Sequence, residues 1–327
     1  MNIVLLAGGA SPEREISLRS GKAIYRALIE LGHKVSLVDP ALGFHQPKSV
    51  EDFFNPQLNT EKVSIENYLE AFQLETFNEC DLVFIILHGK WGEDGTVQAI
   101  LELMNIKYTG CDVLASAIAI DKDLTKTIVM QNGIKTPPWF LHEKNHEVDY
   151  KEIADKVGLP CVFKPNDQGS TIGFSLVDSI DNFEEAINLA LKYSDKVLVE
   201  KYIKGRELTV SILGDIALPV IEVKPKHVMY DYECKYTKGM TEYYCPADLP
   251  EEITEKVKKL SLMAFNSCRC RTFGRVDFIL DETNELYFLE INTIPGMTDL
   301  SLVPMAAKVF GLDFNSLIQR IIDLSLS

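Results

Sequence analysis

Four residues near the C-terminus have the types and spacing of a metal-binding face: Arg275, Asp277, Glu290 and Asn292. Arg275 and Asp277 are two positions apart in the chain, as are Glu290 and Asn292, so the side chains of each pair share one face if the segment is a strand. In a symmetric hairpin, Asp277 faces Glu290 and Arg275 faces Asn292. Two directly opposed carboxylates repel each other, and a divalent cation between them would remove that penalty. Carboxylate and amide oxygens are hard donors that suit Mg²⁺ shared with substrate phosphates.

The segments that hold these residues read as two strands of one hairpin. Residues 274–280 and 287–292 each alternate polar and apolar residues, and residues 281–285 have the composition of a turn. The alternative interpretation is an ordinary hairpin whose polar side faces solvent. The register also predicts an apolar opposite face made of Val276, Phe278, Leu280, Tyr287, Leu289 and Ile291.

A second group of residues has the features of a phosphate site. Lys164 ends a predicted strand and leads into residues 166–173, where Gly169 and Gly173 would let backbone amides converge on an anion. Ser170 adds a hydroxyl donor. A plain hairpin turn is the alternative. Neither standard nucleotide fingerprint, Gly-x-Gly-x-x-Gly nor Gly-x4-Gly-Lys-Ser/Thr, is present, so a nucleotide would be bound by another route.

Two further segments fit a nucleotide site. Residues 197–203 read as a strand among whose apolar side chains an adenine would be held by backbone groups. Glu200 would accept from an amino group and Glu207 from ribose hydroxyls, although surface carboxylates beside a turn are the alternative. Residues 230–239 contain three Tyr and two Lys, a composition typical of a loop that closes over an active site or of a mobile surface loop.

Composition restricts the class of protein. A length of 327 residues suggests two or three domains, and 46% apolar with 25% charged residues is ordinary for a globular chain. The net charge of −15 argues against a surface that binds nucleic acid or anionic membrane. The N-terminus reads as a strand and turn rather than a signal peptide. The seven cysteines form no Cys-x-x-Cys pair, which predicts reduced thiols and a cytoplasmic protein.

The elements that would position these residues follow an α/β pattern in the first ~110 residues. Loops 8–15 and 88–95 then fall at the carboxyl ends of strands, where functional loops of such sheets lie. Residues 162–200 read as a small α+β unit, and the remainder is rich in strands. The expected strands are 3–7, 34–38 and 81–87; the expected helices are 16–31, 97–104, 116–132, 251–266 and 314–324.

One motif is a decoy. His142-Glu143-Lys144-Asn145-His146 matches His-Glu-x-x-His, the zinc-protease pattern. That site requires a helix with apolar flanks and a further ligand, whereas this segment closely follows Pro137-Pro138 and has polar neighbours. We therefore expect a surface turn.

Taken together, the motifs resemble the ATP-grasp ligases, specifically the D-alanine–D-alanine ligase family, nearly from end to end. Each match is weak alone, but their number and order make a strong signal. They comprise residues 8–18, His88-Gly89 with 92–95, Asp121-Lys122, Lys164-Pro165, 169–173, 200–202, 205–207, 230–232 with 235–236, 245–247, 274–277, 290–298 and 301–304.

The resemblance implies an α/β chain, α+β in part, with three domains that clasp ATP between the central and C-terminal domains. These would be an N-terminal open parallel sheet domain (1–112), a small central α+β domain with the glycine-rich loop (113–199) and a C-terminal antiparallel-sheet domain (200–327). The implied reaction phosphorylates one D-alanine to an acyl phosphate, which the amine of a second D-alanine then attacks. It implies ATP as co-substrate, two Mg²⁺ or Mn²⁺ ions, a monovalent cation as an open question, and a homodimer.

The resemblance also assigns roles by position. Asp277, Glu290 and Asn292 would hold Mg²⁺. Glu13, beside His88, would bind the first D-alanine, and Ser301 with the Leu302 amide would bind the carboxylate of the second. Arg275 and the Gly296 amide would stabilise the oxyanion, and Ser170 and Tyr236 would join Glu13 in a group that closes the site. The residues implied around ATP are Lys122, Lys164, Ser170, Glu200, Lys201, Tyr202, Ile203, Glu207 and Lys235.

Alternatives remain within and outside this family. A ligase of the same fold that makes D-alanyl-D-lactate or D-alanyl-D-serine is the nearest, but Tyr236 favours the dipeptide, because the depsipeptide enzymes typically have His there. A more distant one is an ATP-grasp ligase for other acids. A nucleotide-binding regulator without catalysis is disfavoured, because such a protein has no use for Arg275. The departures from the family pattern are Thr171, where a second Ser is common, and the basic segment 268–273.

Overall fold

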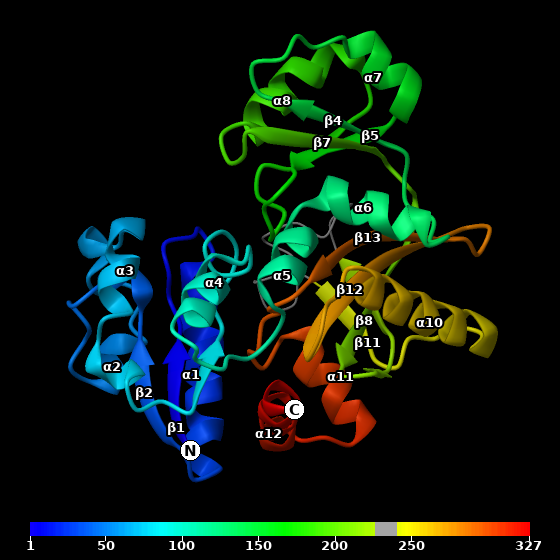
Figure 1. Ribbon diagram of the computed structural model, residues 1–327. Coiled ribbons are helices and arrows are strands. Elements are labelled where there is room, and N and C mark those ends of the chain that lie inside the picture. Colours follow the sequence, from blue (N-terminus) through cyan, green and yellow to red (C-terminus); the bar gives the residue numbers. More distant parts are fainter. Residues whose placement is uncertain (226–240) are drawn as a thin grey trace.

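The computed structural model describes residues 1–225 and 241–327. Within these residues the strands form three separate sheets, one parallel and two antiparallel. Figure 1 shows the corresponding bodies as an N-terminal unit in blue, a central unit in green and a C-terminal unit in yellow to red. The predicted class, α/β with an α+β part, is confirmed.

The N-terminal unit is built on a parallel sheet with the order β2-β1-β3. Strands β1 and β3 are continuous apolar runs, because residues of a parallel sheet are covered on both faces. The predicted open parallel sheet is therefore confirmed. Its elements are β1 (Asn2–Leu6), α1 (Arg14–Glu30), β2 (Lys34–Val38), α2 (Val50–Phe53), α3 (Tyr68–Ala71), β3 (Leu82–Ile85) and α4 (Thr96–Leu103), with short 3-10 turns between β2 and β3.

The helix expected over 116–132 is wrong as a single element. The structure has two helices, α5 (Val113–Ile120) and α6 (Lys122–Gln131), separated at Asp121. Asp121 has an extended backbone, and its carboxylate accepts a hydrogen bond from the Leu124 amide at 3.0 Å, which is an N-cap. The break makes Lys122 the first residue of α6, and its amide bonds to the Asn166 carbonyl at 3.1 Å.

The central unit is an antiparallel sheet with the order β4-β7-β5-β6, covered by two helices. The expected succession of strand, glycine loop, strand, helix and strand is confirmed, while β4 and α7 were not predicted. Phe163 and Phe183 pack with ring centroids 4.8 Å apart between sheet and helix. The elements are β4 (Trp139–Glu143), α7 (Tyr150–Val157), β5 (Cys161–Pro165), β6 (Ser175–Val177), α8 (Phe183–Ala190) and β7 (Lys196–Lys201).

The C-terminal unit contains an antiparallel sheet with the order β11-β10-β8-β12-β13, and β9 pairs with β8. Helix α10 lies along it (Figure 1), and the helices expected near 251–266 and 314–324 are confirmed. Helix α11 was not predicted. The elements are β8 (Gly205–Leu213), β9 (Ile216–Ala217), β10 (Ile221–Pro225), β11 (Thr241–Tyr244), α10 (Glu251–Ser267), β12 (Phe273–Asp281), β13 (Leu286–Asn292), α11 (Leu302–Phe310) and α12 (Phe314–Leu326).

The hairpin of β12 and β13 confirms the predicted pairing of its polar residues but not the whole apolar face. Asp277 pairs with Glu290, but the register then shifts and Phe278 pairs with Phe288. This bulge gives β13 one extra residue, so Phe288 replaces Leu289 in the buried core beside Phe278. Leu289 instead lines a cavity, and Tyr287 is only half-buried.

The last helix returns to the beginning of the chain. Side chains of α12 such as Ile318 share one buried cluster with Leu5 of β1 and Leu28 of α1. Asn315 donates a hydrogen bond to Glu30 at 2.8 Å. Among the described helices, none combines the length and apolar character that a bilayer crossing demands. This shared core places the last helix of the chain against the N-terminal unit. The domain boundaries near 112 and 200 stay predictions.

Candidate active site

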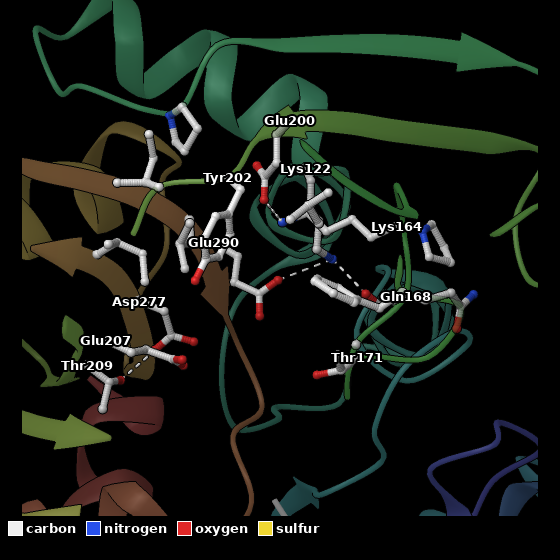
Figure 2. Close-up of a pocket in the computed structure, with 18 of the residues that line it drawn as sticks. Lys122, Lys164, Gln168, Thr171, Glu200, Tyr202, Glu207, Thr209, Asp277 and Glu290 are labelled. Atoms are coloured by element: carbon white, nitrogen blue, oxygen red, sulfur yellow. Dashed lines mark hydrogen bonds and ion pairs between the residues drawn. The ribbon is translucent and has the colours of Figure 1, made fainter. Parts of the chain in front are cut away.

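A cavity with about 1020 Å³ of empty space lies between the central and C-terminal sheets. Figure 2 shows its polar side chains pointing inward from both sides. Its lining combines cations, carboxylates and apolar side chains such as Ile279 and Leu289. Of the residues expected around ATP, it contains Lys122, Lys164, Glu200, Lys201, Tyr202, Ile203 and Glu207.

Two lysines meet carboxylates at this cavity. Lys122 is buried, donates to the Gln168 carbonyl at 2.7 Å and lies 3.4 Å from Glu290 (Figure 2). Lys164 lies 2.5 Å from the Glu200 carboxylate. Both lysines therefore stand where a phosphate chain could take over the carboxylate's place as their partner.

Glu200 sits at the centre of a charge cluster that the sequence did not indicate. It lies on the central strand β7, and its second oxygen is 2.8 Å from Nζ of Lys126. Burial would raise the pKa of Glu200, but the positive charges of Lys126 and Lys164 outweigh it and bring the pKa to about 2. Glu200 is thus a carboxylate at neutral pH.

Two of the predicted metal ligands, Asp277 and Glu290, line this cavity, whereas Asn292, two residues after Glu290 on β13, does not. Asp277 accepts hydrogen bonds from Thr209 at 2.5 Å and from Arg275 at 2.9 Å. Asn292 Oδ1 is buried and has no hydrogen-bond partner among the described residues. Asn292 lies two residues after Glu290 on β13, and Asp277 pairs with Glu290, so this carbonyl oxygen shares a strand face with two opposed carboxylates, a donor set that suits a magnesium ion.

Metal binding at this site would need more than carboxylates: the side-chain oxygen of Asn292 and the phosphate oxygens of a bound nucleotide would complete the set of donors. Over residues 1–225 and 241–327, no group of three or more His, Cys, Asp or Glu side chains is placed to hold a metal. The same finding covers the described His142 motif, whose form is only partly the expected surface turn. His142 and Glu143 end strand β4, with His142 buried, and only the residues after them form a turn.

A second cavity, with about 1570 Å³ of empty space, adjoins the first. The two share Gly169, Arg275, Glu290 and Leu302 in their linings. The second also brings together most of the residues expected around the amino-acid substrates. These are Glu13, His88, Ser170, Arg275, Gly296, Ser301 and Leu302, and the expected metal ligand Asn292 also lines this cavity.

Glu13 and Ser170 join the N-terminal and central units inside the second cavity. The Ser170 hydroxyl donates to the Glu13 carboxylate, and both residues are buried. Ser170 has a φ of 51°, the left-handed region that non-glycine residues seldom occupy, so the surrounding loop holds it in place. A side chain at Gly89 would come within 2.7 Å of Glu13, which explains the glycine there.

His88 and Glu93 surround Glu13 with further buried titratable groups. Burial lowers the pKa of His88, although the nearby charge of Glu13 opposes this. Burial raises the pKa of Glu93 to about 8, and the charge of Glu13 acts in the same direction. Glu93 was part of a matched motif but had no assigned role. It accepts from the amides of Gly89 at 2.6 Å and Ile294 at 3.2 Å.

The loop between β13 and α11 supplies the remaining expected groups. Ser301 precedes α11, and its hydroxyl accepts a hydrogen bond from the Thr298 amide at 2.9 Å. Leu302 is the first residue of that helix, so its amide is one of the unpaired donors at a helix start. The Met297 amide next to Gly296 donates to Ser20 at 3.1 Å, which fixes this loop against α1. The expected Lys235 and Tyr236 lie outside the described residues.

Comparisons with known proteins agree along the whole chain. Residues 2–111 match the family model for the N-terminus of D-ala D-ala ligase, and residues 128–323 match that for its C-terminus. The D-alanine–D-alanine ligase of Aquifex aeolicus is 44% identical over 98% of this chain and all of the relative. That of Desulforamulus reducens is 42% identical over all of this chain and 99% of the relative.

Solved structures show the same fold. The D-alanine–D-alanine ligase of Bacillus anthracis has a TM-score of 0.81 at 31% identity, covering 100% of this chain and 97% of the other. A structure of that enzyme complexed with ATP gives a TM-score of 0.80 with the same coverage. The D-Ala:D-Ser ligase of Enterococcus faecalis gives 0.81 at 28% identity, covering 99% and 98%. With two adjoining cavities, a full-length match in sequence and a shared fold, the chain belongs to the D-alanine–D-alanine ligase family.

Proposed function

We propose that this protein joins two D-alanine molecules to D-alanyl-D-alanine at the expense of ATP, through an acyl phosphate, as a step in peptidoglycan precursor synthesis. One observation carries the proposal: the cavity with lysines and carboxylates shares Arg275 and Glu290 with the cavity that contains Glu13 and Ser301. The terminal phosphoryl group of ATP bound in the first cavity would therefore lie next to the carboxylate of a D-alanine bound in the second, to which it is transferred. The relatives of similar length carry the name of this activity.

In the nucleotide cavity, Lys122 and Lys164 contact phosphate oxygens, and Glu200 and Glu207 accept from the adenine amino group and the ribose. Tyr202 and Ile203 flank the base with Lys201, and Lys235 adds a further phosphate contact. Asp277, Glu290 and Asn292 hold Mg²⁺ or Mn²⁺, two ions in all. The metal supplies charge neutralisation on the phosphate oxygens. Support comes from the placement of these residues around the first cavity, apart from Asn292, which lines the adjoining cavity, and Lys235, which lies outside the described residues.

In the amino-acid cavity, Glu13 pairs with the ammonium group of the first D-alanine beside His88. Ser301 and the Leu302 amide bind the carboxylate of the second. Its amine attacks the acyl carbon of the acyl phosphate, and Arg275 and the Gly296 amide stabilise the negative oxygen that develops. The bond from carbon to the phosphate oxygen then breaks, which releases inorganic phosphate and a proton from the amine and leaves the amide bond of the dipeptide. Ser170 and Tyr236 hold Glu13 and close the site, because an acyl phosphate exposed to water would hydrolyse.

The test is phosphate release from ATP and Mg²⁺ with D-alanine, compared with L-alanine, D-serine and D-lactate, with products identified by mass. D-alanine-dependent release with formation of the dipeptide is expected. Turnover only with a mixed partner would assign the chain to a ligase of another second substrate. We further propose a cytoplasmic homodimer that binds neither nucleic acid nor membrane, which sedimentation of the purified protein and cell fractionation would check.

A further inference from the structure

Lys126 is a completely buried lysine that the reaction, as described, does not use. It lies on α6, and its side chain is 0% exposed. Its ammonium group contacts residues of three other segments. It donates to Thr136 at 2.5 Å, lies 2.8 Å from Glu200 on β7 and stands 5.6 Å from the ring centroid of Trp139 on β4. Such a charge stays buried only where a partner compensates it.

Glu200 has two cationic partners, one on each oxygen. Lys164 approaches one oxygen at 2.5 Å and lines the nucleotide cavity (Figure 2), whereas Lys126 approaches the other and does not line it. The cluster of one carboxylate and two ammonium groups has an excess positive charge. If one lysine moves away, the buried Glu200 carboxylate still keeps the other lysine as its counter-ion.

We propose that Lys126 is a positioning residue: it is the permanent counter-ion of Glu200, which keeps this carboxylate ionised and fixed for the adenine amino group when Lys164 turns to the nucleotide phosphates. This inference rests on the proposed function. Without Lys126, the move of Lys164 would leave Glu200 buried and unpaired, a state that buried carboxylates avoid by taking up a proton or holding their partner.

The local electrostatics agree with this exchange. The pKa of Lys126 is lowered to about 8, because burial and the charge of Lys164 lower it more than the charge of Glu200 raises it. Lys126 is thus still cationic at pH 7. When Lys164 moves to the phosphates, a charge that repels Lys126 moves away from it. The protonated form of Lys126 is then favoured, and it remains the counter-ion of Glu200 while the nucleotide is bound.

The experiment compares Lys126→Met, Glu200→Gln and the double variant with the full-length wild type. Binding of ATP and of ITP with Mg²⁺ is measured by calorimetry, since inosine carries a carbonyl oxygen in place of the adenine amino group. KM for D-alanine and thermal melting are measured on the same samples. Lys151→Met, an exposed lysine of the same unit, is the control for loss of a positive charge.

Lys126→Met is expected to weaken ATP binding about tenfold and to reduce the preference for ATP over ITP by a similar factor, since a protonated Glu200 no longer selects an amino group. KM for D-alanine stays within about twofold. The double variant binds ATP as Glu200→Gln does, because Lys126 acts only through Glu200. Lys151→Met matches the wild type.

An unchanged preference for ATP over ITP in Lys126→Met, or an equal loss of ATP and D-alanine affinity, would overturn the proposal. If Lys126→Met does not fold, Glu200→Gln and the double variant still decide: weaker ATP binding by the double variant contradicts a role through Glu200. A wild type that binds ATP but makes no dipeptide refutes the proposed function, while the binding comparison still tests Lys126. A wild type that does not bind ATP refutes both.

Discussion

The Ser170 hydroxyl donates a hydrogen bond to the Glu13 carboxylate, across 157 residues of sequence. This contact connects the glycine loop of the central unit with the start of α1 in the N-terminal unit. Both side chains are buried and line the amino-acid cavity. The carboxylate expected to bind the substrate ammonium group is therefore held by the loop that also borders the nucleotide.

Replacing Glu13 by Gln is expected to raise KM for the first D-alanine by about 10- to 100-fold, because a charge-assisted contact with the ammonium group is lost. ATP affinity is expected to stay within twofold of wild type by the same argument, since Glu13 does not line the nucleotide cavity. Initial rates at varied D-alanine give the first value and calorimetry the second.

Glu15→Gln, in the first turn of the helix that follows Glu13, is the matched control. Glu15 pairs with Arg19 at 2.5 Å on the surface, with its side chain 46% exposed, so its replacement should leave the rates unchanged. A D-alanine KM for Glu13→Gln equal to that of Glu15→Gln would refute the role of Glu13.

Arg275→Met is expected to lower kcat by about 10²- to 10³-fold, the loss typical when an oxyanion donor is removed. Arg275 lies at the junction of the two cavities, where the acyl group would react. ATP affinity should remain largely intact, because the bound metal then compensates Asp277. Dipeptide formation and equilibrium ATP binding are the measurements.

Arg206→Met controls for the loss of a paired guanidinium in the same sheet. Arg206 binds Glu222 through two nitrogens at 2.8 and 2.7 Å, as Arg275 binds Asp277, but it lines neither cavity. We expect near-normal turnover from this variant. A large loss of ATP binding in Arg275→Met would show that the residue serves the nucleotide rather than the oxyanion.

Asn292→Ala is expected to raise the Mg²⁺ concentration for half-maximal rate by about tenfold, because one of the three protein side chains of the metal site is removed. Chelation of divalent ions from the wild type should abolish turnover, and Mg²⁺ or Mn²⁺ should restore it. Rates are measured across a magnesium titration at saturating ATP. Asn315→Ala, on the far surface of α12, is the control. An identical magnesium dependence in both variants would contradict the ligand role of Asn292.

The polar face of the hairpin was predictable because two-residue periodicity survives in the sequence of both strands. Asp277 and Glu290 are paired as this periodicity requires. The assignment of Leu289 to the core failed, because a bulge adds one residue without changing the alternation of residue types. Likewise the apolar periodicity runs through Asp121, and only its N-cap geometry reveals that one expected helix is two.

The residues that sequence reasoning missed are those whose role depends on convergence of distant segments. Lys126 reads as one polar position of a helix, but Thr136, Trp139 and Glu200 enclose it. Glu93 reads as a loop carboxylate, but it accepts from the amide of Ile294, 201 residues later in the chain. The residues next to Lys126 and Glu93 in the chain do not reveal which distant segments surround them in the fold. The residues of the two cavities could be predicted because many motifs of the family occur in the chain in the same order.

Glu93 should make the protein less stable as the pH rises. Burial raises its pKa to about 8, above the 4.5 of an unperturbed glutamate, so between these values the folded state keeps a proton that the unfolded state has lost. Its contribution to the free energy of unfolding therefore falls from pH 5 to pH 8, by at most about 1.4 kcal/mol per pH unit. In Glu93→Gln, an uncharged side chain of the same shape, this decline should disappear. Urea unfolding of both proteins at several pH values measures the difference, in which the titrating groups that do not interact with Glu93 cancel. Parallel pH profiles for the two proteins would show that Glu93 is already ionised throughout this range.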